Sequence, residues 1–322
     1  MKTSLLRRGL CALAIWPALL HAQDAPTVTK IVIGYGAGGG ADAITRAYAQ
    51  ALATRLHRTV VVENRPGAGG TLAVAAAKSG PRDGSLLVFG NVVTHVLAPY
   101  TYRNLAYDPA NDFAVVGEMA RFDLALAVNA STPVHTLAEF VTWAKADPRR
   151  ASFGTAGSGS LPHFFGLLLG KATGLPMVNV PYKSGSAINN DLIGGQLPSA
   201  VSALSDYVQM QKAGRLRMLA TSGETRARSA PDVPTFRELG YPQLTGHSFF
   251  ALFAPAGLPA AELSRLQTAM RESAADPQVQ KVIEGLGIDL PVANADDFSR
   301  SLRQQRERWA EVVRASGFTA EN

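Results

Sequence analysis

Two glycine-rich segments, far apart in the chain, have the composition of anion-binding loops. Gly34–Gly40 follows a β-branched run at Thr29–Ile33 and precedes the helical pattern of Ala41–Leu56. Gly154–Ser160 precedes a second helical pattern, Leu161–Thr173, and adds threonine and serine hydroxyls. Glycines let backbone N–H groups approach a ligand closely, and the N-terminus of the following helix favours negative charge. We therefore expect the two loops to hold one anion, such as a carboxylate, from opposite sides.

The first loop also fits two other interpretations. Gly34, Gly36 and Gly39 form a literal GxGxxG, and Glu63 follows 24 residues after Gly39, near the place of the ribose-binding acid in a dinucleotide site. Five glycines in seven residues satisfy such a spacing easily by chance, which makes an exported, dinucleotide-binding oxidoreductase the weaker alternative. A plain tight turn without a ligand is the other.

Asp42 stands in the first turn of the helix that follows the first loop. As a first-turn acid or N-cap it would stabilise that helix by about 0.5–2 kcal/mol. As a ligand contact it would accept a hydrogen bond from a hydroxyl, an amine or a bridging water. The two roles are compatible, and the sequence leaves both open.

The chain carries no recognisable catalytic motif. No G-x-S-x-G surrounds Ser158, none of the six histidines has a partner four residues away, and H-E-x-x-H is absent. His163 is the only histidine expected near the second loop, where a lone histidine is more often a structural hydrogen-bonding residue than a base. We expect no enzyme, no metal and no cofactor.

The N-terminus has the pattern of a cleaved secretory signal. Arg7 and Arg8 precede an apolar run, Gly9–Leu20, and Ala22 offers a small residue before a cut at Gln23. The apolar run is too short to span a bilayer permanently. We expect residues 1–22 to be removed and the mature protein to be periplasmic, not membrane-embedded.

The charge balance argues against nucleic acid as a partner. The whole chain has 31 Lys and Arg against 25 Asp and Glu, and residues 1–22 hold three of the positive ones, so the mature net charge is about +3. Nucleic-acid binding needs a concentrated basic stripe, whereas this mild excess suits small anions. Residues 1–22 also hold Cys11, the only cysteine, so the mature chain has no thiol for a disulfide or a metal site.

Short β-branched runs alternate with longer helical patterns, which predicts an α/β architecture with parallel sheets. Strands are expected at Thr29–Ile33, Val60–Val62, Leu86–Phe89, Phe113–Gly117, Leu124–Val128, Ser152–Gly154, Val178–Pro181, Ala200–Leu204, Arg217–Thr221 and Phe249–Phe253. Helices are expected at Ala41–Leu56, Thr71–Lys78, Thr136–Lys145, Leu161–Thr173, Ala187–Ile193, Ala260–Ala275, Pro277–Leu286 and Asp296–Ala315.

The length and order of these elements predict two lobes. About 300 mature residues exceed one ordinary core, and a second α/β set begins near residue 125. The last third is mostly helical and must pack on an existing lobe. The chain is therefore expected to build most of lobe 1 (residues 23–124), then lobe 2 (125–249), and to return to lobe 1 (250–322). Two crossing strands, near 124–129 and 249–254, would leave a cleft between the lobes.

A series of motifs resembles the extracytoplasmic solute receptors of tripartite tricarboxylate transporters, known as the Bug family. The resemblance covers about Lys30 to Gly317. It is carried by the runs Tyr35–Asp42 (YGAGGGAD), Val62–Gly70 (VENRPGAGG), Tyr107–Pro109, Asp112–Phe113, Gly154–Ser160 with His163, Val180–Lys183 (VPYK), Asp191–Leu192, Gly194–Gln196, Pro231–Thr235 (PDVPT) and Ala254–Gly257 (APAG).

Membership of that family implies a type II periplasmic binding fold, an α/β fold with two Rossmann-like lobes and a ligand cleft that closes like a Venus flytrap. The implied ligands are small carboxylates: dicarboxylates, tricarboxylates, aromatic acids or amino acids. The implied partners are the membrane permease subunits of a tripartite transporter, and we expect a monomer. The candidate ligand-binding residues are Tyr35, Gly36, Ala37, Gly38, Gly39, Asp42, Thr155, Ala156, Gly157, Ser158, Gly159, Ser160, His163, Tyr182, Lys183 and Ser202.

Several of these assignments have alternatives. Lys183 is either a counter-ion for the ligand or a solvated lysine, and the Glu63 to Gly70 run is interpreted as a structural turn. The same features also fit a periplasmic sensor that binds the solute and docks on a signalling protein.

Three stretches depart from the family's pattern. The apolar run Phe164–Leu167 follows His163 where an acidic residue is common. Ser202 replaces an acid or amide, and Ser248–Phe250 replaces a tryptophan. These departures favour a more apolar ligand, such as an aromatic or branched acid.

Overall fold

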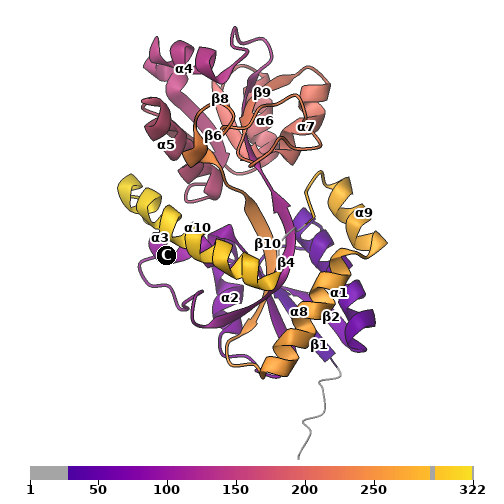
Figure 1. Ribbon diagram of the computed structural model, residues 1–322. Coiled ribbons are helices and arrows are strands. Elements are labelled where there is room, and N and C mark those ends of the chain that lie inside the picture. The colour runs from indigo at the N-terminus through magenta and orange to yellow at the C-terminus, as the bar shows by residue number, and fades with distance from the viewer. Residues whose placement is uncertain (1–27, 291–293, 321–322) are drawn as a thin grey trace, which may run out of the picture.

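Two five-stranded sheets form the framework of the protein (Figure 1). The computed structural model describes residues 28–290 and 294–320. The first sheet, in the order β2-β1-β3-β10-β4, consists of β1 (Val28–Ile33), β2 (Thr59–Asn64), β3 (Leu86–Asn91), β4 (Phe113–Phe122) and β10 (Ser248–Pro255). The second, in the order β7-β6-β8-β5-β9, consists of β5 (Leu124–Asn129), β6 (Ser152–Ala156), β7 (Val178–Tyr182), β8 (Ser199–Ala203) and β9 (Leu216–Thr221). The expected signal segment, with Cys11, lies outside the described residues.

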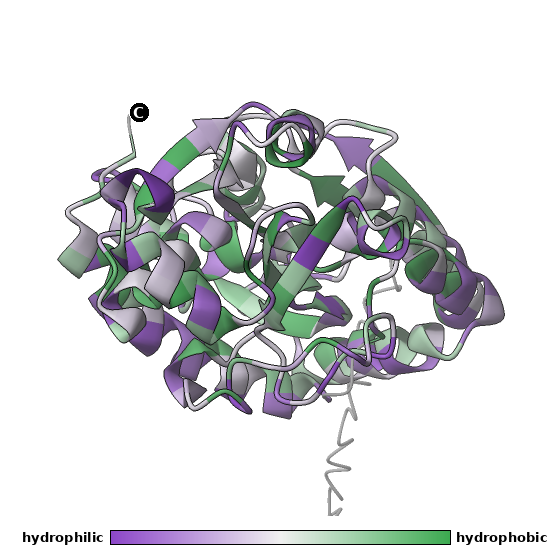
Figure 2. Cartoon of the chain, turned by 90° about the horizontal axis from the view of Figure 1, so that it is seen from above, coloured by the Kyte–Doolittle hydropathy of each residue, from purple (hydrophilic) through white to green (hydrophobic). Residues whose placement is uncertain are grey.

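Helices surround both sheets (Figure 1). They are α1 (Gly40–Leu56), α2 (Thr71–Ala77), α3 (Ala98–Thr101), α4 (Leu137–Lys145), α5 (Leu161–Thr173), α6 (Gly185–Ile193), α7 (Ser205–Lys212), α8 (Ala260–Ala274), α9 (Pro277–Gly285) and α10 (Ala295–Ser316), with short helical turns η1 (Ala68–Gly70), η2 (Val93–Leu97), η3 (Pro148–Ala151) and η4 (Pro242–Leu244). In Figure 2 hydrophobic residues lie mainly along the central strands and hydrophilic residues on the peripheral helices. This distribution follows from the strands being covered by helices on both faces.

The sheets are mixed, so the expectation of parallel sheets is wrong for one strand in each. β10 runs antiparallel to β3 and β4, and β5 runs antiparallel to β8 and β9. The other pairs, β1 with β2 and β3 and β6 with β7 and β8, are parallel as expected. The physical reason is the route of the chain. β5 and β10 each enter a sheet from the junction between the two, which is the side where the parallel strands end.

The expected strands and long helices are confirmed, and apart from the short turns η1, η3 and η4 two helical segments were not expected. Residues 93–101 form η2 and α3, although their β-branched run (Val92, Val93, Thr94, Val96) is typical of a strand. α7 was not expected because its buried residues, Tyr207 and Val208, are adjacent instead of spaced by three or four. Tertiary packing decides the conformation in both places.

The passage between the sheets is short and held by one serine. β4 ends at Phe122 and β5 begins at Leu124, so Asp123 alone joins them. On the returning chain, the Ser222 hydroxyl accepts a hydrogen bond from the Leu124 N–H (2.9 Å) and donates one to the Gly246 carbonyl (2.6 Å). Ser222 therefore ties the outgoing strand to the returning strand. The lobe boundaries proposed from the sequence, at 124–125 and 249–250, stay a prediction.

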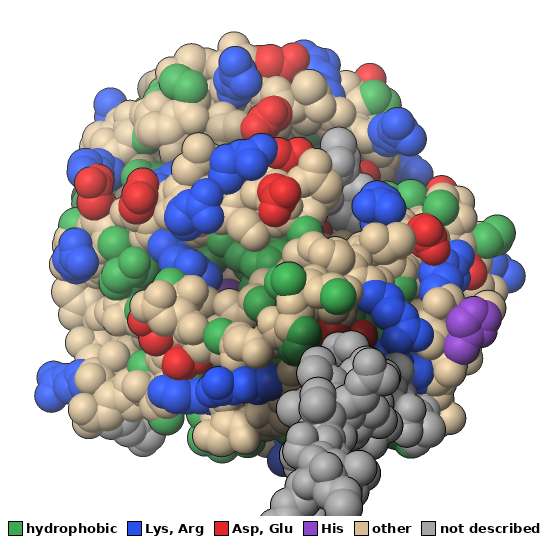
Figure 3. Space-filling view, turned by 60° about the horizontal axis from the view of Figure 1, so that its bottom comes forward, with side chains coloured by type: hydrophobic (Ala, Val, Ile, Leu, Met, Phe, Trp, Pro, Cys, Tyr) green, Lys and Arg blue, Asp and Glu red, His purple; other side chains and the backbone are tan. Residues whose placement is uncertain are grey.

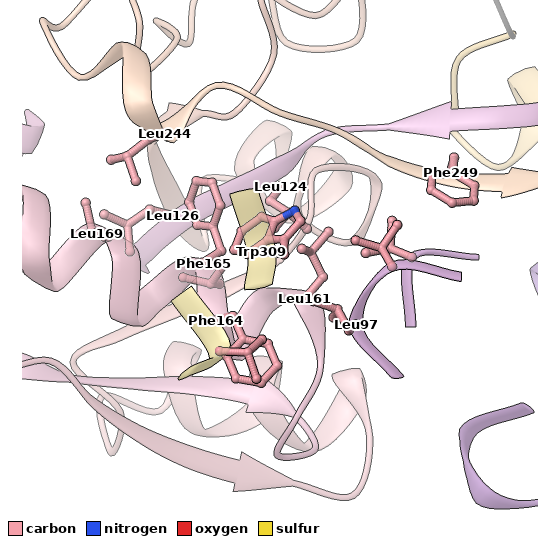
Figure 4. Close-up of a cluster of buried hydrophobic side chains, with 14 of the residues drawn as sticks. Leu97, Leu124, Leu126, Leu161, Phe164, Phe165, Leu169, Leu244, Phe249 and Trp309 are labelled. Carbon is pink, nitrogen blue, oxygen red and sulfur yellow. The ribbon is translucent and has the colours of Figure 1, made fainter. Parts of the chain in front are cut away.

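The C-terminal helix α10 contacts elements of both sheets, whereas the sequence assigned residues 250–322 to lobe 1 alone. Arg306 donates to the carbonyls of His95 (2.8 Å) and Pro109 (2.9 Å), next to the first sheet. Trp309 is buried in a cluster that includes residues of β5 and α5 (Figure 4). Phe318, just beyond the helix, packs edge-on against Phe164 of α5 at 5.6 Å between ring centroids. Buried residues of α10, such as Trp309, therefore pack beyond the first sheet.

Replacing Ser222 by alanine is expected to destabilise the protein by about 1–3 kcal/mol, because a buried N–H and a carbonyl both lose their partner. Urea unfolding at neutral pH measures the loss. Ser264→Ala, at an exposed position of α8, is the matched control and should change stability by less than about 0.5 kcal/mol. Equal effects of the two substitutions would contradict the role given to Ser222.

Candidate functional site

A cleft of about 230 Å³ lies where the ends of strands from both sheets meet. The first sheet and the segment after β3 contribute Asn91, Val92, Val93, Phe122, Ser248 and Phe250, and the second sheet and the start of α5 contribute Leu124, Ala156, Ser160, Leu161, Pro162, Ser202 and Ala203. A larger groove, about 650 Å³, runs between α5 and α10, away from the strand ends. The carboxyl ends of strands are where open α/β sheets bind ligands, so we take the smaller cleft as the candidate site.

The first glycine loop is held in place by Asp42, which is almost completely buried. Its carboxylate accepts hydrogen bonds from the Gly38 N–H (2.9 Å), Arg46 Nε (3.0 Å) and Asn64 Nδ2 (2.9 Å). Burial alone would raise the pKa of Asp42, but these hydrogen bonds and the Arg46 charge hold it at about 2. The first-turn role of Asp42 thus accounts for these contacts, and any ligand contact would be additional.

The segment Glu63–Gly70, at the end of β2 and after it, also helps to hold the first glycine loop in place. Asn64 Nδ2 donates to the Tyr35 carbonyl (3.0 Å) as well as to Asp42, so it joins two points of the loop. At Gly34 a Cβ would stand 2.4 Å from the Gly70 Cα, so the two chains need glycine to pass. Glu63 instead forms exposed ion pairs, with Lys30 at 2.7 Å and with Arg65. These contacts agree with the structural turn expected for this run.

Tyr35 connects the first loop to the cleft. Its hydroxyl donates to the Gly69 carbonyl (3.1 Å) and accepts a hydrogen bond from Asn91 Nδ2 (2.6 Å), and Asn91 lines the cleft. Burial raises the pKa of Tyr35, so its hydroxyl stays protonated at neutral pH. A Cβ at Gly36 or Gly39 would meet nothing within 4 Å, so packing does not require glycine at either position.

The second loop is ordered by its own polar groups. Ser160 caps α5, accepting from the His163 N–H (3.3 Å) and donating to the Gly157 carbonyl (2.9 Å). The His163 Nδ1 accepts from the Gly159 N–H (3.0 Å), and burial lowers the His163 pKa, so the ring is neutral with its proton on Nε2. The Thr155 hydroxyl donates to Asn179 Oδ1 (2.6 Å). His163 therefore has the structural role that a lone histidine usually has.

The structure brings three of the sequence-predicted residues into the cleft lining and places the others around it. Ala156, Ser160 and Ser202 line the cleft, and Tyr35 contacts it through Asn91. The predicted residues outside this lining are Gly36, Ala37, Gly38, Gly39, Asp42, Thr155, Gly157, Ser158, Gly159, His163, Tyr182 and Lys183. The assignment of all these residues to the ligand stays a prediction.

Two residues at strand ends of the second sheet have protein partners. The Tyr182 hydroxyl donates to Asp191 Oδ2 (2.7 Å), and burial together with this carboxylate raises the pKa of Tyr182 to about 12. The Ser202 hydroxyl donates to Asp206, in the first turn of α7. Lys183 is exposed.

Sequence reasoning missed much of the lining on the side of the first sheet. Asn91, Val92 and Val93 follow β3, and no motif marks them. Phe122 lies at the end of β4, where the expected strand was too short to place it. Phe250 lies in the expected strand Phe249–Phe253, but this run is apolar throughout, so no alternation in the sequence shows which face Phe250 occupies.

The passage between the sheets carries an unusual carboxyl group. Asp123 is half-buried, and burial followed by the negative charge of Asp289 raises its pKa to about 7, with Arg121 acting in the opposite direction. Asp289 comes from the segment after α9, whose backbone pairs with Arg121 (3.0 and 2.9 Å). The carboxyl groups of Asp123 and Asp289 thus lie near each other where the chain passes from the first sheet to the second.

The described residues hold no group of three or more His, Cys, Asp or Glu side chains that could bind a metal ion. Within the same residues no helix is both long and apolar enough to cross a membrane. Positive and negative side chains are interspersed on the face shown in Figure 3.

The fold and the cleft define a class, the periplasmic binding proteins, and solved structures agree. The chain is similar to a periplasmic transporter, with 30% identity and a TM-score of 0.76 over 91% of this chain and 98% of that one. It is also similar to the periplasmic binding protein BugD, with 27% identity and a TM-score of 0.73 over 91% and 98% of the two chains. MatC of Rhodopseudomonas palustris, solved with bound malate, shows 26% identity and a TM-score of 0.74 over 89% and 98%.

The chain belongs to the tripartite tricarboxylate transporter family receptors, whose model matches residues 44–318. A UPF0065 protein of Bordetella bronchiseptica is 33% identical over 316 residues, 98% of this chain and 93% of the relative. BugT of Bordetella pertussis is 27% identical over 289 residues, 89% of each chain. Members of this family are solute-binding transport receptors, so the protein is not an enzyme, and the oxidoreductase alternative is wrong.

Asp42→Asn is expected to destabilise the protein by about 2 kcal/mol at pH 7. The folded pKa of Asp42, about 2, lies below its ordinary value of 3.8, so its stabilisation is present above pH 4 and is lost as the pH falls toward 2. Urea unfolding at pH 7 and pH 3 should show the difference from wild type shrinking at the lower pH. Asp296→Asn, an exposed first-turn acid of α10, is the control, and a pH-independent difference for Asp42→Asn would contradict the assignment.

Asp123→Asn is expected to stabilise the protein by about 1–3 kcal/mol at pH 8 and to change little at pH 4. Because the pKa of Asp123 is raised from 3.8 to about 7 in the fold, the folded state keeps a proton that the unfolded chain releases, and stability falls as the pH rises through this range. The asparagine variant cannot lose that proton. Unfolding curves from pH 4 to 8 test this, and a variant whose stability falls with pH as steeply as wild type would refute it.

Proposed function

We propose that this protein captures a small carboxylate in the periplasm and presents it to the membrane permease of a tripartite tricarboxylate-type transporter. The observation that carries the proposal is a cleft of about 230 Å³ lined by residues of both sheets. Sites for drug-sized ligands measure about 300–1,000 Å³, so this cleft suits a smaller molecule. Relatives of the same fold have been solved with malate and with adipate bound, which supports a carboxylate as ligand.

The negative charge of the ligand would be held by the start of α5. This helix is 13 residues long, and its N-terminus, at Ser160, Leu161 and Pro162, opens into the cleft. The N–H groups of Ser160 and Leu161 and the helix dipole favour an anion there without a cationic side chain, whereas Pro162 has no N–H and the His163 N–H already donates to Ser160. Exposed Ser158, on the same loop, can add a hydroxyl.

Closure of the two sheets on the ligand would turn binding into a signal for the permease. A ligand in the cleft touches both sides, so it binds the closed arrangement better than the open one and shifts the population toward it. The short passage through Asp123, with the Ser222 hydrogen bonds, is where such a movement would take place. We also propose that residues 1–22 are cleaved off when the protein is exported to the periplasm.

A thermal-shift screen with malate, adipate, citrate and benzoate tests the proposal directly. A ligand that binds only the folded protein raises its melting temperature by mass action, so at least one carboxylate should raise it in a concentration-dependent way. NAD, included as the negative control, should not. No shift with any carboxylate at millimolar concentration would contradict the proposal.

Ser160→Ala should weaken binding of the carboxylate that gives the largest shift by about tenfold, measured by calorimetry, because the hydrogen bonds of Ser160 to Gly157 and His163 hold the start of α5 in place at the cleft. Ser184→Ala is a matched control, because Ser184 caps α6 with the same hydrogen-bond pattern but does not line the cleft. Both variants lose about 0.5–2 kcal/mol of stability through the lost cap, and only Ser160→Ala should lose affinity. Equal affinities of the two variants would show that the second loop does not hold the ligand.

A further inference from the structure

The wall of the cleft is unusually apolar for an anion-binding site. Nine of its thirteen lining residues are apolar, four are uncharged polar residues, and none is charged. Aliphatic side chains such as Val92, Val93 and Leu161 surround the position where a ligand would extend from the start of α5. The part of the ligand beyond its carboxylate would therefore contact apolar side chains, and no charged side chain of the lining would bind it.

Three of the four polar side chains of the lining, those of Asn91, Ser160 and Ser202, already donate to protein partners. Asn91 donates to Tyr35 and accepts from the Thr94 N–H (3.1 Å), and Ser160 both accepts and donates within its own loop. The Ser202 hydroxyl donates to Asp206. These three side chains therefore have little donor capacity left for a second polar end of a ligand.

Four aromatic rings follow one another on the side of the first sheet. Phe122 and Phe250 have ring centroids 5.2 Å apart, Phe250 and Phe89 are also 5.2 Å apart, and Phe89 meets Tyr35 edge-on at 5.8 Å. Phe122 and Phe250 line the cleft and are only partly buried, so part of each ring is free to contact a ligand. Separations of this size and tilted orientations are those in which aromatic rings attract one another, and a further ring can extend the series.

An acidic side chain lies next to the side of the cleft formed by the second sheet. Asp206, in the first turn of α7, accepts a hydrogen bond from the hydroxyl of Ser202, which lines the cleft; burial raises the pKa of Asp206, and this hydrogen bond acts in the opposite direction. A second carboxylate on the ligand would approach this side chain without a lining cation to offset the repulsion. Dicarboxylates are therefore disfavoured relative to monocarboxylates.

From these contacts we propose that the ligand is an aromatic monocarboxylate. Phe122 and Phe250 contact its ring, and Asp206 excludes a second carboxylate. The inference rests on the proposed function, because it assigns the substrate class of the same cleft. It also places two ring-contacting residues on β4 and β10, the strands that lead into and out of the passage between the sheets, so the apolar body of the ligand would touch the elements that move on closure.

The test on the wild-type protein is a calorimetric comparison of five carboxylates. Benzoate and phenylacetate provide the ring, hexanoate provides an aliphatic chain of similar size, and malate and adipate provide a second carboxylate. We expect an aromatic acid to bind at least about tenfold more tightly than hexanoate and than either diacid.

Variants assign the preference to the named residues. Phe122→Leu and Phe250→Leu keep the wall apolar but remove a ring, and each should weaken phenylacetate binding about tenfold while changing hexanoate binding less than threefold. Asp206→Asn should strengthen adipate binding about tenfold. Asp232→Asn, which removes an exposed acid elsewhere in the same part of the chain, is the matched control and should leave it unchanged. Circular dichroism and the melting temperature establish that each variant is folded.

The outcomes separate this inference from the proposed function. Malate, adipate or hexanoate binding as tightly as the aromatic acids would overturn the inference and leave carboxylate capture supported. Phenylalanine variants that keep the full preference for the ring would overturn the assignment of Phe122 and Phe250. If both aspartate variants gain adipate affinity equally, Asp206 has no specific role. No binding of any carboxylate would overturn the proposed function and the inference together.

Discussion

The passage of the chain through Asp123 constrains the arrangement of everything around it. With a single residue between β4 and β5, the end of one sheet must stand next to the start of the other, and the Ser222 hydrogen bonds hold the returning chain to the same point. The carboxyl ends of the parallel strands in both sheets then face a common space. The cleft, the mixed strand directions and the position of Phe122 in the cleft wall all follow from this constraint.

The two loops beside the cleft are held in their conformations by internal hydrogen bonds. Asp42 and Asn64 form hydrogen bonds to the backbone of the first loop, and His163 and Ser160 form hydrogen bonds to the backbone of the second. Preorganised groups lose less freedom when a ligand arrives, which favours affinity without any added contact. These four side chains, which belong to the family's motifs, thus serve the loops themselves, while the side chains in the cleft wall are mainly apolar.

Much of the fold could be predicted from the sequence, since its strands and helices have strong periodic patterns. The helix at Leu161–Thr173 was placed at its observed bounds because a serine precedes it and a glycine follows it. The segment at 93–101 could not be predicted, because its β-branched residues favour a strand and only burial of Val96 and Leu97 in the core explains a helical turn there. In the site, Ser160 and Ser202 were expected, whereas Asn91 and Phe122 belong to no local pattern.

The sequence by itself determined the family, the succession of two α/β sets and the two glycine loops, because these depend on residue types at short spacing. Only the tertiary structure decided which residues share the cleft, because that depends on chain segments more than a hundred residues apart meeting at one passage. The aromatic series from Tyr35 to Phe122 shows the difference. Its four rings come from four strands of the first sheet or their ends, and their contacts cannot be derived from sequence spacing.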